Sequence, residues 1–301
     1  ILCEECYSPV DLSVGGLLSA SSNYEFGEST LKAPINTGNI TVTHSDTDKT
    51  VHMTVGGIVG DLYSGTICKN DAGKKGYVKG VITVTSSSEA DATQYRCVGG
   101  VAGFTTKGVF EDIDVLAEGT SVNANFSTIP ANFHIAGVIG CVNSGSAVLK
   151  NITNNAPVTV TIDTMASDGY GYLGGITGRL VGAVHTENLT NNGKVTIEAK
   201  TKMARQLNMG GVFAVNTDAI GLHKNIVNNG EVLIKKGTYA AIYLGGISGG
   251  EQPLGKATNY FENCTNNGAI NLEDGVVATD HIRMGGCFGW TKGVYDKNIR
   301  N

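Results

Sequence analysis

The chain of 301 residues is predicted to fold as an all-β, right-handed parallel β-helix of about eight repeats, each 35–43 residues long. Three observations support this prediction: a Gly-Gly phrase that recurs along the chain, an Asn-rich phrase that recurs in step with it, and short runs of alternating apolar and polar residues. A fixed period of 20–50 residues is typical of a solenoid, in which each repeat buries its apolar face against its neighbours.

The Gly-Gly phrase joins an apolar residue, two small residues and a second apolar residue. Its eight copies begin at Val14, Val55, Val98, Ile135, Leu173, Met209, Leu244 and Met284, at spacings of 41, 43, 37, 38, 36, 35 and 40 residues. The residue before the pair is always apolar, and so is the residue after it, although strict alternation would turn the latter outward. We therefore expect a corner or bulge at the pair, with positions minus one and minus three facing the core.

The Asn-rich phrase begins at Asn151, Asn188, Asn225 and Asn263, and the second copy reads NLTNNGKVTIE. Asn and Gly tolerate positive φ, so the Asn-Asn-Gly step is predicted to be the turn. In a stacked coil each turn recurs about 4.8 Å above its copy, and aligned Asn side chains can then form a hydrogen-bonded ladder. In the third repeat VFEDID, at 109–114, replaces the phrase, so we expect the ladder to be interrupted there.

The third observation is a period of two within each repeat. Alternating β-branched and polar residues predict half-buried strands, and no segment shows a helical stripe. Such alternations occupy residues 40–43, 82–85, 158–161, 195–198 and 270–273. One coil per repeat is favoured over two shorter coils, because the variation in repeat length suits loops within a coil.

Composition limits the possible partners. The formal net charge is −5, from 22 basic and 27 acidic residues that are dispersed along the chain, so no basic stripe indicates nucleic-acid binding. No run of 18 apolar residues predicts a membrane span. Residues 1–13 are predicted to be a lead-in or cap, and residues 14–301 a single β-helix domain. The last four residues begin another Asn phrase, so we expect further repeats or domains of the same polypeptide beyond Asn301.

The seven cysteines do not predict a metal site. Cys3 and Cys6 form an isolated C-x-x-C without a second pair, so a structural zinc site is not favoured, and their disulfide state stays open. Cys264 and Cys287 stand where sister repeats carry Ile, Leu or Val, and are interpreted as core residues. We expect no metal and no cofactor.

Catalytic patterns are also missing from the sequence. The densest acidic stretch, Glu111, Asp112 and Asp114, is interpreted as a solvated strand face rather than as a pair of glycosidase carboxylates. No G-x-S-x-G elbow is present, and the glycine phrases recur too often to be phosphate loops. The chain is therefore predicted not to be an enzyme.

The phrases GGIVG at 56–60 and NCTNNGAI at 263–270 resemble the Glug-type and related β-helical repeats of adhesin-like surface proteins of Gram-negative gut bacteria. The resemblance covers residues 14–301. It implies an extracellular protein at the bacterial cell surface, associated with the outer membrane, with a binding role and no catalytic residues to transfer.

A binding face is predicted on the side of the strands opposite the core. Positions minus two and minus four before the Gly-Gly pair are expected to point outward, and they are rich in Tyr and His. The candidate ligand-binding residues are His52, Tyr95, His134, Tyr170, Tyr172, Tyr243, His281 and Arg283. Tyr rings suit sugar faces and protein partners, and Arg283 suits a carboxylate of an acidic sugar. The same residues would also be explained by cross-strand packing alone.

The leading hypothesis is therefore a non-catalytic, adhesin-like surface protein that binds glycans or surface molecules of a host or partner through an exposed β-helix face. One alternative is a structural stalk that presents another domain. The other is a β-helix polysaccharide lyase or hydrolase, since many parallel β-helices have such activities.

Overall fold

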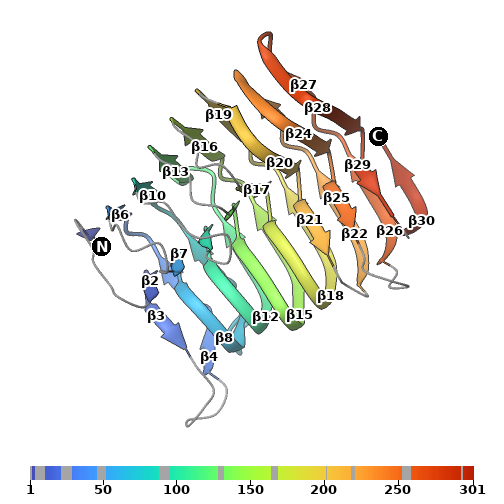
Figure 1. Ribbon diagram of the computed structural model, residues 1–301. Coiled ribbons are helices and arrows are strands. Elements are labelled where there is room, and N and C mark those ends of the chain that lie inside the picture. The colour runs from blue at the N-terminus through green and yellow to red at the C-terminus, as the bar shows by residue number, and fades with distance from the viewer. Residues whose placement is uncertain are drawn as a thin grey trace.

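The computed structural model describes residues 2–3, 11–21, 29–45, 52–87, 95–127, 132–163, 169–200, 202–217, 221–252, 259–292 and 294–301. The chain winds into a solenoid in which every paired strand is parallel to its neighbours (Figure 1). The predicted all-β parallel β-helix is therefore confirmed. The described residues contain no helix, and hence none that is long and apolar enough to cross a membrane.

Three sheets run along the solenoid. Sheet 1 comprises β1 (Leu2–Cys3), β6 (Ile40–His44), β10 (Val81–Ser86), β13 (Ser121–Phe126), β16 (Val158–Ile162), β19 (Val195–Ala199), β23 (Val232–Ile234) and β27 (Ile270–Leu272). Sheet 2 comprises β2 (Asp11–Gly15), β7 (His52–Gly56), β11 (Arg96–Gly99), β14 (Asn132–Ala136), β17 (Tyr170–Gly174), β20 (Lys202–Gly210), β24 (Gly237–Gly245) and β28 (Val276–Gly285).

Sheet 3 holds the longest strands. Its main path comprises β3 (Leu18–Ser21), β8 (Val59–Cys68), β12 (Ala102–Val115), β15 (Ile139–Asn154), β18 (Thr177–Asn191), β21 (Phe213–Thr217), β25 (Ser248–Gln252) and β29 (Phe288–Thr291). Paired beside that path are β4 (Ser29–Lys32), β5 (Ile35–Asn36), β9 (Gly76–Val78), β22 (Leu222–Asn228), β26 (Asn259–Asn266) and β30 (Val294–Arg300).

Each sequence repeat forms one coil. Residues paired across sheet 3 are one repeat apart, as in Asn154 with Asn191 and Asn191 with Asn228. The expectation of one coil per repeat is therefore correct. About six turns have a neighbouring turn on each side. This number is slightly smaller than the eight sequence repeats, because the first and last repeats form the end turns.

Two apolar cores fill the solenoid. The first lies between sheets 1 and 2 and contains seven of the eight residues at minus one, such as Val55 and Ile135, while Met284 of the last turn is exposed. It also contains minus-three residues such as Met53. The second is enclosed by sheet 3, whose long strands are bulged between Thr105 and Val109 and at the matching place in β15. The predicted inward orientation of positions minus one and minus three is confirmed.

The Gly-Gly pair is the corner between sheets 2 and 3, as predicted. A Cβ atom at Gly137 would lie 2.3 Å from Nδ2 of Asn154 and 2.3 Å from the carbonyl oxygen of Gly175. A similar clash would arise at Gly175, with Asn191. Because no side chain fits there, the Asn turn packs directly against the corner and forms a waist between the two cores.

An Asn ladder runs along this waist. The side-chain Nδ2 of Asn154 donates to Oδ1 of Asn191 at 2.9 Å, and the pattern continues through Asn228, Asn266 and Asn301 at 2.8–2.9 Å. Nδ2 of Asn154 also donates to the carbonyl oxygen of Ala156, and the Ala156 N–H donates back to its Oδ1. The buried amides therefore have partners on both sides, which removes the cost of burying them.

The positive-φ residue is not the one predicted. It is the first Asn of each phrase rather than the Asn-Asn-Gly step, with φ between 54° and 56° at Asn151, Asn188, Asn225, Asn263 and Asn298. These side chains form a second, outer ladder, in which Asn188 donates to Asn151 at 2.8 Å. Asn is suited to both tasks, since its short amide tolerates the left-handed region and can bond to its copy.

The predicted interruption at VFEDID is wrong for the outer ladder and right for the waist. Asp112 adopts φ 55° and accepts a hydrogen bond from Nδ2 of Asn151 at 3.0 Å, so it acts as the last member of the outer ladder. At the waist, however, Val115 pairs with Asn154, and an apolar side chain cannot continue the hydrogen bonds.

The waist ladder gives a direct test. Replacing buried Asn191 by Ala removes the ladder bonds that it makes with Asn154 and Asn228, so we expect the free energy of unfolding to fall by about 1–3 kcal/mol. The adjacent Asn192 is the control, since its ladder of side-chain bonds is exposed. Asn192→Ala should cost less than about 0.5 kcal/mol. Urea denaturation followed by circular dichroism measures both, and equal losses would contradict a special role for the waist.

Candidate functional site

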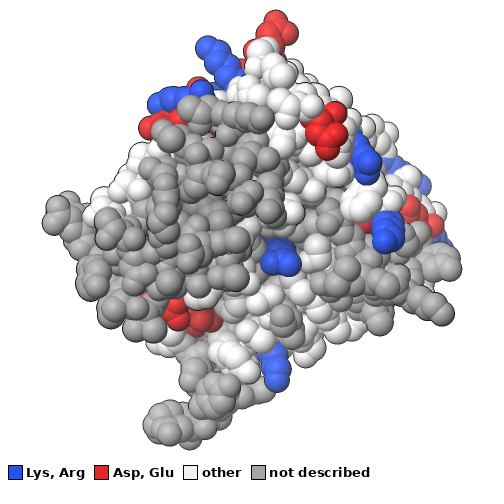
Figure 2. Space-filling view, in the orientation of Figure 1, with Lys and Arg blue, Asp and Glu red and all other residues white. Residues whose placement is uncertain are grey.

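The described charged side chains on one face of the solenoid are dispersed (Figure 2). On the face shown in Figure 2, the described Lys, Arg, Asp and Glu residues are scattered without a continuous basic stripe. Many are paired between neighbouring turns, as in Lys150 with Glu187 at 3.2 Å and Lys194 with Glu231 at 2.6 Å. Exposed pairs of this kind contribute little, about 0–1 kcal/mol each.

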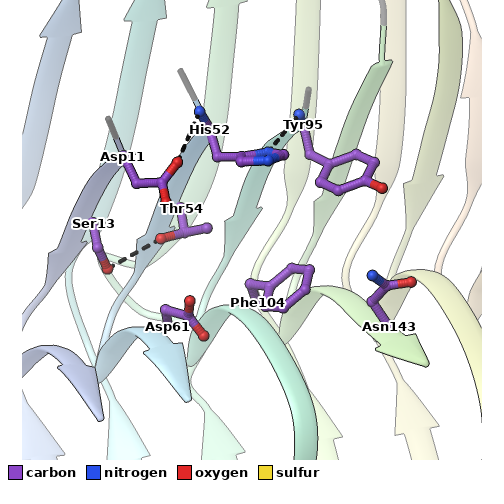
Figure 3. Close-up of a pocket in the computed structure, with 8 residues that line it drawn as sticks. All are labelled: Asp11, Ser13, His52, Thr54, Asp61, Tyr95, Phe104 and Asn143. Atoms are coloured by element: carbon purple, nitrogen blue, oxygen red, sulfur yellow. Dashed lines mark hydrogen bonds between the residues drawn. The ribbon is translucent and has the colours of Figure 1, made fainter. Parts of the chain in front are cut away.

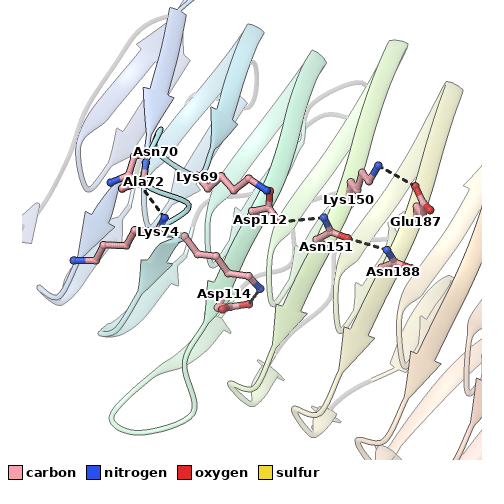
Figure 4. A network of polar contacts seen from close by, with 11 residues as sticks. Lys69, Asn70, Ala72, Lys74, Asp112, Asp114, Lys150, Asn151, Glu187 and Asn188 are labelled. Carbon is pink, nitrogen blue, oxygen red and sulfur yellow. Dashed lines mark hydrogen bonds and ion pairs between the residues drawn. The ribbon is translucent and has the colours of Figure 1, made fainter.

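The acidic stretch of the third repeat belongs to the same surface network (Figure 4). Lys69 lies 3.1 Å from Asp112, and Lys75 lies 3.2 Å from Asp114. Burial raises the pKa of Asp112, but the hydrogen bonds from Lys69 and Asn151 outweigh it and lower that pKa below its ordinary value. Asp112 is thus committed to the ladder and its ion pair. The solvated strand face expected for this stretch is wrong for Asp112, because that side chain is buried against the neighbouring turns.

Two columns of side chains face each other where sheet 2 meets the beginnings of the sheet 3 strands. The sheet 2 column holds the minus-two residues, and each is followed seven positions later by its counterpart in the sheet 3 column. By turn, the pairs are Ser13 and Ala20, Thr54 and Asp61, Cys97 and Phe104, His134 and Cys141, Tyr172 and Arg179, Asn208 and Val215, Tyr243 and Gly250, and Arg283 and Trp290.

Contacts across the two columns show that the sheets meet at an angle. The guanidinium carbon of Arg179 lies 5.7 Å from the centroid of the Tyr172 ring, and that of Arg283 lies 5.4 Å from the centroid of Trp290. The outer face of sheet 2 is therefore one wall of a cleft rather than a free surface, and sheet 3 supplies the other wall.

The cleft opens into a pocket of about 260 Å³ toward the N-terminal end of the solenoid (Figure 3). It is lined by Asp11, Ser13, His52, Thr54, Asp61, Tyr95, Phe104 and Asn143. The backbone N–H of Tyr95 donates to Nδ1 of His52 at 3.2 Å, and the N–H of His52 donates to Oδ1 of Asp11 at 3.3 Å. The proton of a neutral His52 ring is thus placed on Nε2.

The electrostatics of the pocket are set by burial. Burial raises the pKa of the Asp61 carboxyl to about 6, and the negative charge of Asp11 adds to the effect. Burial likewise lowers the pKa of His52, and the opposing pull of Asp11 does not reverse it. At neutral pH the pocket therefore holds a neutral imidazole beside carboxylates, and Asp61 takes up a proton as the pH falls below about 6.

The structure brings five of the eight predicted residues together. The His52 and Tyr95 rings are stacked with centroids 5.0 Å apart, the Tyr95 and His134 centroids lie 5.2 Å apart, and those of His134 and Tyr172 lie 4.9 Å apart. Tyr170 stacks on Tyr172 at 6.1 Å. These rings form a continuous file over four turns of sheet 2.

The remaining three form a separate group. The Tyr243 hydroxyl and Nε2 of His281 lie 2.7 Å apart, and the guanidinium carbon of Arg283 lies 5.4 Å from the Tyr243 ring centroid. Trp290 of sheet 3 completes the group, with its ring 5.7 Å from that of Tyr243. Buried Asn208 stands in register between Tyr172 and Tyr243, so the predicted residues do not form one aromatic patch.

Two predicted ligand-binding residues are not exposed. His134 has no exposed surface and Tyr243 is only 7 % exposed. Both side chains lie on the outer side of sheet 2, as alternation requires, but the sheet 3 strands cover that side at their turns. His134 and Tyr243 are therefore buried in the angle where sheet 2 meets sheet 3.

Sequence reasoning missed the sheet 3 wall. Asp61, Phe104 and Asn143 line the pocket, yet they stand beyond the Gly-Gly corner, in β8, β12 and β15 of sheet 3. The available signal was the pair of residues seven apart across the corner, because a tight corner brings the two strands side by side. That signal also reveals a buried group, Cys97, His134 and Cys141, whose ligand atoms all lie within 4.8 Å of one another.

No family model, curated protein or solved structure matches the chain.

The raised pKa of Asp61 predicts a pH-dependent stability. The folded chain binds this proton more tightly than the unfolded chain between about pH 4 and pH 6, so the free energy of unfolding should fall as the pH rises through that interval. Asp61→Asn should remove this fall and stabilise the protein at pH 7 by about 1–2 kcal/mol, allowing for partial exposure.

The measurement is the urea midpoint at pH 4, 5, 6 and 7 for the parent and for Asp61→Asn. Asp71→Asn is the control, since that carboxylate is exposed and paired with Lys32 at 2.7 Å. A parent and an Asp61→Asn variant with parallel pH profiles would show that Asp61 is not buried as described.

Proposed function

We propose that this chain is a non-catalytic, adhesin-like surface protein that binds glycans in the cleft between sheets 2 and 3. The observation that supports this best is the composition of the open pocket, where rings of His52, Tyr95 and Phe104 stand beside hydrogen-bonding groups of Asp11 and Asn143. A sugar ring has an apolar face and a rim of hydroxyls, so it needs this combination of a flat surface and polar acceptors.

The size and charge of the pocket narrow the ligand. A volume of about 260 Å³ is slightly below the ~300–1,000 Å³ of drug-sized sites, which suits one ring-sized group at a time. Asp11 and Asp61 carry negative charge at neutral pH, which disfavours acidic sugars at this end. We therefore propose a neutral glycan here, instead of the acidic sugar that Arg283 suggested from sequence.

The direction of the cleft favours an extended ligand. The file of rings from His52 to Tyr172 runs from turn to turn along the solenoid, and Tyr170 stacks beside it. A glycan chain lying along this file would meet the partly exposed rings of His52 and Tyr95 and, beyond buried His134, those of Tyr170 and Tyr172. An extended segment of a partner protein would meet the same rings. An extracellular location at the bacterial surface follows from the Glug-type resemblance and is part of the proposal.

A polysaccharide hydrolase or lyase is the second candidate, because of one observation. The pocket holds two carboxyl groups, Asp11 and Asp61, and the pKa of Asp61 is raised to about 6 by burial. An acid with a raised pKa beside a second carboxylate is the arrangement that glycosidases use. A stalk without a ligand of its own is the remaining alternative.

The test starts with a glycan array probed with the purified chain. For the glycan that binds, Tyr95→Ala should weaken the affinity about tenfold or more, equivalent to about 1.4 kcal/mol, because it removes the central ring of the file. Tyr260→Ala is the matched control, since Tyr260 is 46 % exposed on β26 in sheet 3. Isothermal titration calorimetry on folded variants gives both affinities.

Three outcomes would redirect the proposal. Unchanged affinity in a folded Tyr95→Ala variant would place the binding site outside the cleft. Release of reducing or unsaturated sugar by the parent, lost in Asp61→Asn while binding persists, would identify the hydrolase or lyase. No binding and no product on any glycan would favour the stalk.

A further inference from the structure

A buried group of metal-ligating side chains lies beside the pocket. It contains Cys97 of β11, His134 of β14 and Cys141 of β15, and one ligand atom from each lies within 4.8 Å of the others. Cys97 and His134 have no exposed surface, and Cys141 is 1 % exposed. The group joins two adjacent turns of sheet 2 to sheet 3.

The imidazole of His134 provides an independent sign of a ligand. Both ring nitrogens are buried, and neither has a hydrogen-bond partner in the described part of the chain. A buried polar group without a partner typically costs about 1–3 kcal/mol. The ring is held between those of Tyr95 and Tyr172, at 5.2 and 4.9 Å, so it points into the group rather than toward solvent.

Repeat geometry does not explain these residue types. The equivalent positions of the turns on either side hold Thr54 and Asp61 before the group, and Tyr172 and Arg179 after it. Among the described residues, Cys and His side chains therefore come together at one place in the two columns only, across the adjacent turns of Cys97 and His134. The other described cysteines, Cys68, Cys264 and Cys287, stand elsewhere in the chain.

We propose that Cys97, His134 and Cys141 bind a thiophilic metal ion with a filled d shell, Zn²⁺ or Cu⁺. Two thiolates and one imidazole are a donor set that such ions prefer over Ca²⁺ or Mg²⁺. Zn–S and Zn–N distances of about 2.3 and 2.0–2.1 Å place bound sulfur atoms about 3.8 Å apart. The distances between the three ligand atoms are at most 4.8 Å, so they need to shorten by about 1 Å on metal binding. Rotation of the side chains supplies this change.

The competing product is a disulfide between Cys97 and Cys141. Both cysteines are free in the structure. A disulfide would leave both nitrogens of His134 unsatisfied, whereas a metal ion would bond one of them. The two products differ in mass and in metal content, so one experiment distinguishes them.

The test uses the full chain with Cys3→Ser and Cys6→Ser, which removes the separate C-x-x-C, purified with a phosphine reductant. Zn²⁺ is titrated against a chromophoric chelator, Co²⁺ is titrated for its thiolate charge-transfer band, and Cu⁺ is titrated under argon. We expect one ion per chain and a higher melting temperature with metal. Cys141→Ser should weaken binding at least about 100-fold, since loss of even a supporting hydrogen bond to a ligand costs 10–100-fold.

Cys68→Ser is the matched control and should bind as the parent does, because Cys68 is a partly exposed cysteine outside the group. His134→Gln is the second variant, which keeps much of the ring volume and should also lose the ion. Circular dichroism first shows that each variant is folded. Metal binding that survives in folded Cys141→Ser would overturn the proposal, and so would a reduced parent that binds none of the three ions.

Discussion

The contact between the Asn turn and the Gly-Gly corner is the constraint on which the rest of the structure depends. At each of several turns a buried Asn side chain bonds to its copy in the next turn and to backbone two residues on, while the glycine beside it leaves the space that the amide occupies. The coil is thereby closed at a waist, with one apolar core on each side. Any larger residue at the corner would separate the Asn ladder from the strand it rests on.

This constraint involves few positions, so the others are free to differ from turn to turn. From Asn154 onward the waist residue is Asn at every turn. The two columns of the cleft, in contrast, hold Thr and Asp at one turn, His and Cys at another, and Arg beside Trp at the last. The coils thus repeat regularly, while the side chains that line the cleft differ from turn to turn. Specificity in such an array is expected where the sequence departs from the repeat, since the repeated residues are already committed to the fold.

One residue that lines the pocket, Tyr95, also contacts the Cys-His group. The ring of Tyr95 lies 5.0 Å from His52, which lines the pocket, and 5.2 Å from His134, which belongs to the buried group. Binding of a metal ion by His134 would therefore restrict the Tyr95 ring on the side that contacts His134. The other side of the Tyr95 ring faces the pocket. The two proposals are physically linked in this way, although each has its own test and neither requires the other.

The sequence by itself determined the repeat, the period of two, one coil per repeat and the inward side of the sheet 2 strands, because each of these is local to a strand or follows from the spacing of equal phrases. It also grouped His52, Tyr95, Tyr170 and Tyr172 correctly on one face.

Only the tertiary structure decided what lies against that face. Alternation states which side of its own strand a residue occupies, but the angle at the Gly-Gly corner decides whether that side meets water or sheet 3. For that reason His134 and Tyr243 are buried, Asp61 and Phe104 join the pocket, and Cys141 meets Cys97. The positive φ at Asn151, and its neighbour Asp112 as the end of the ladder, likewise depend on packing between turns that no single repeat contains.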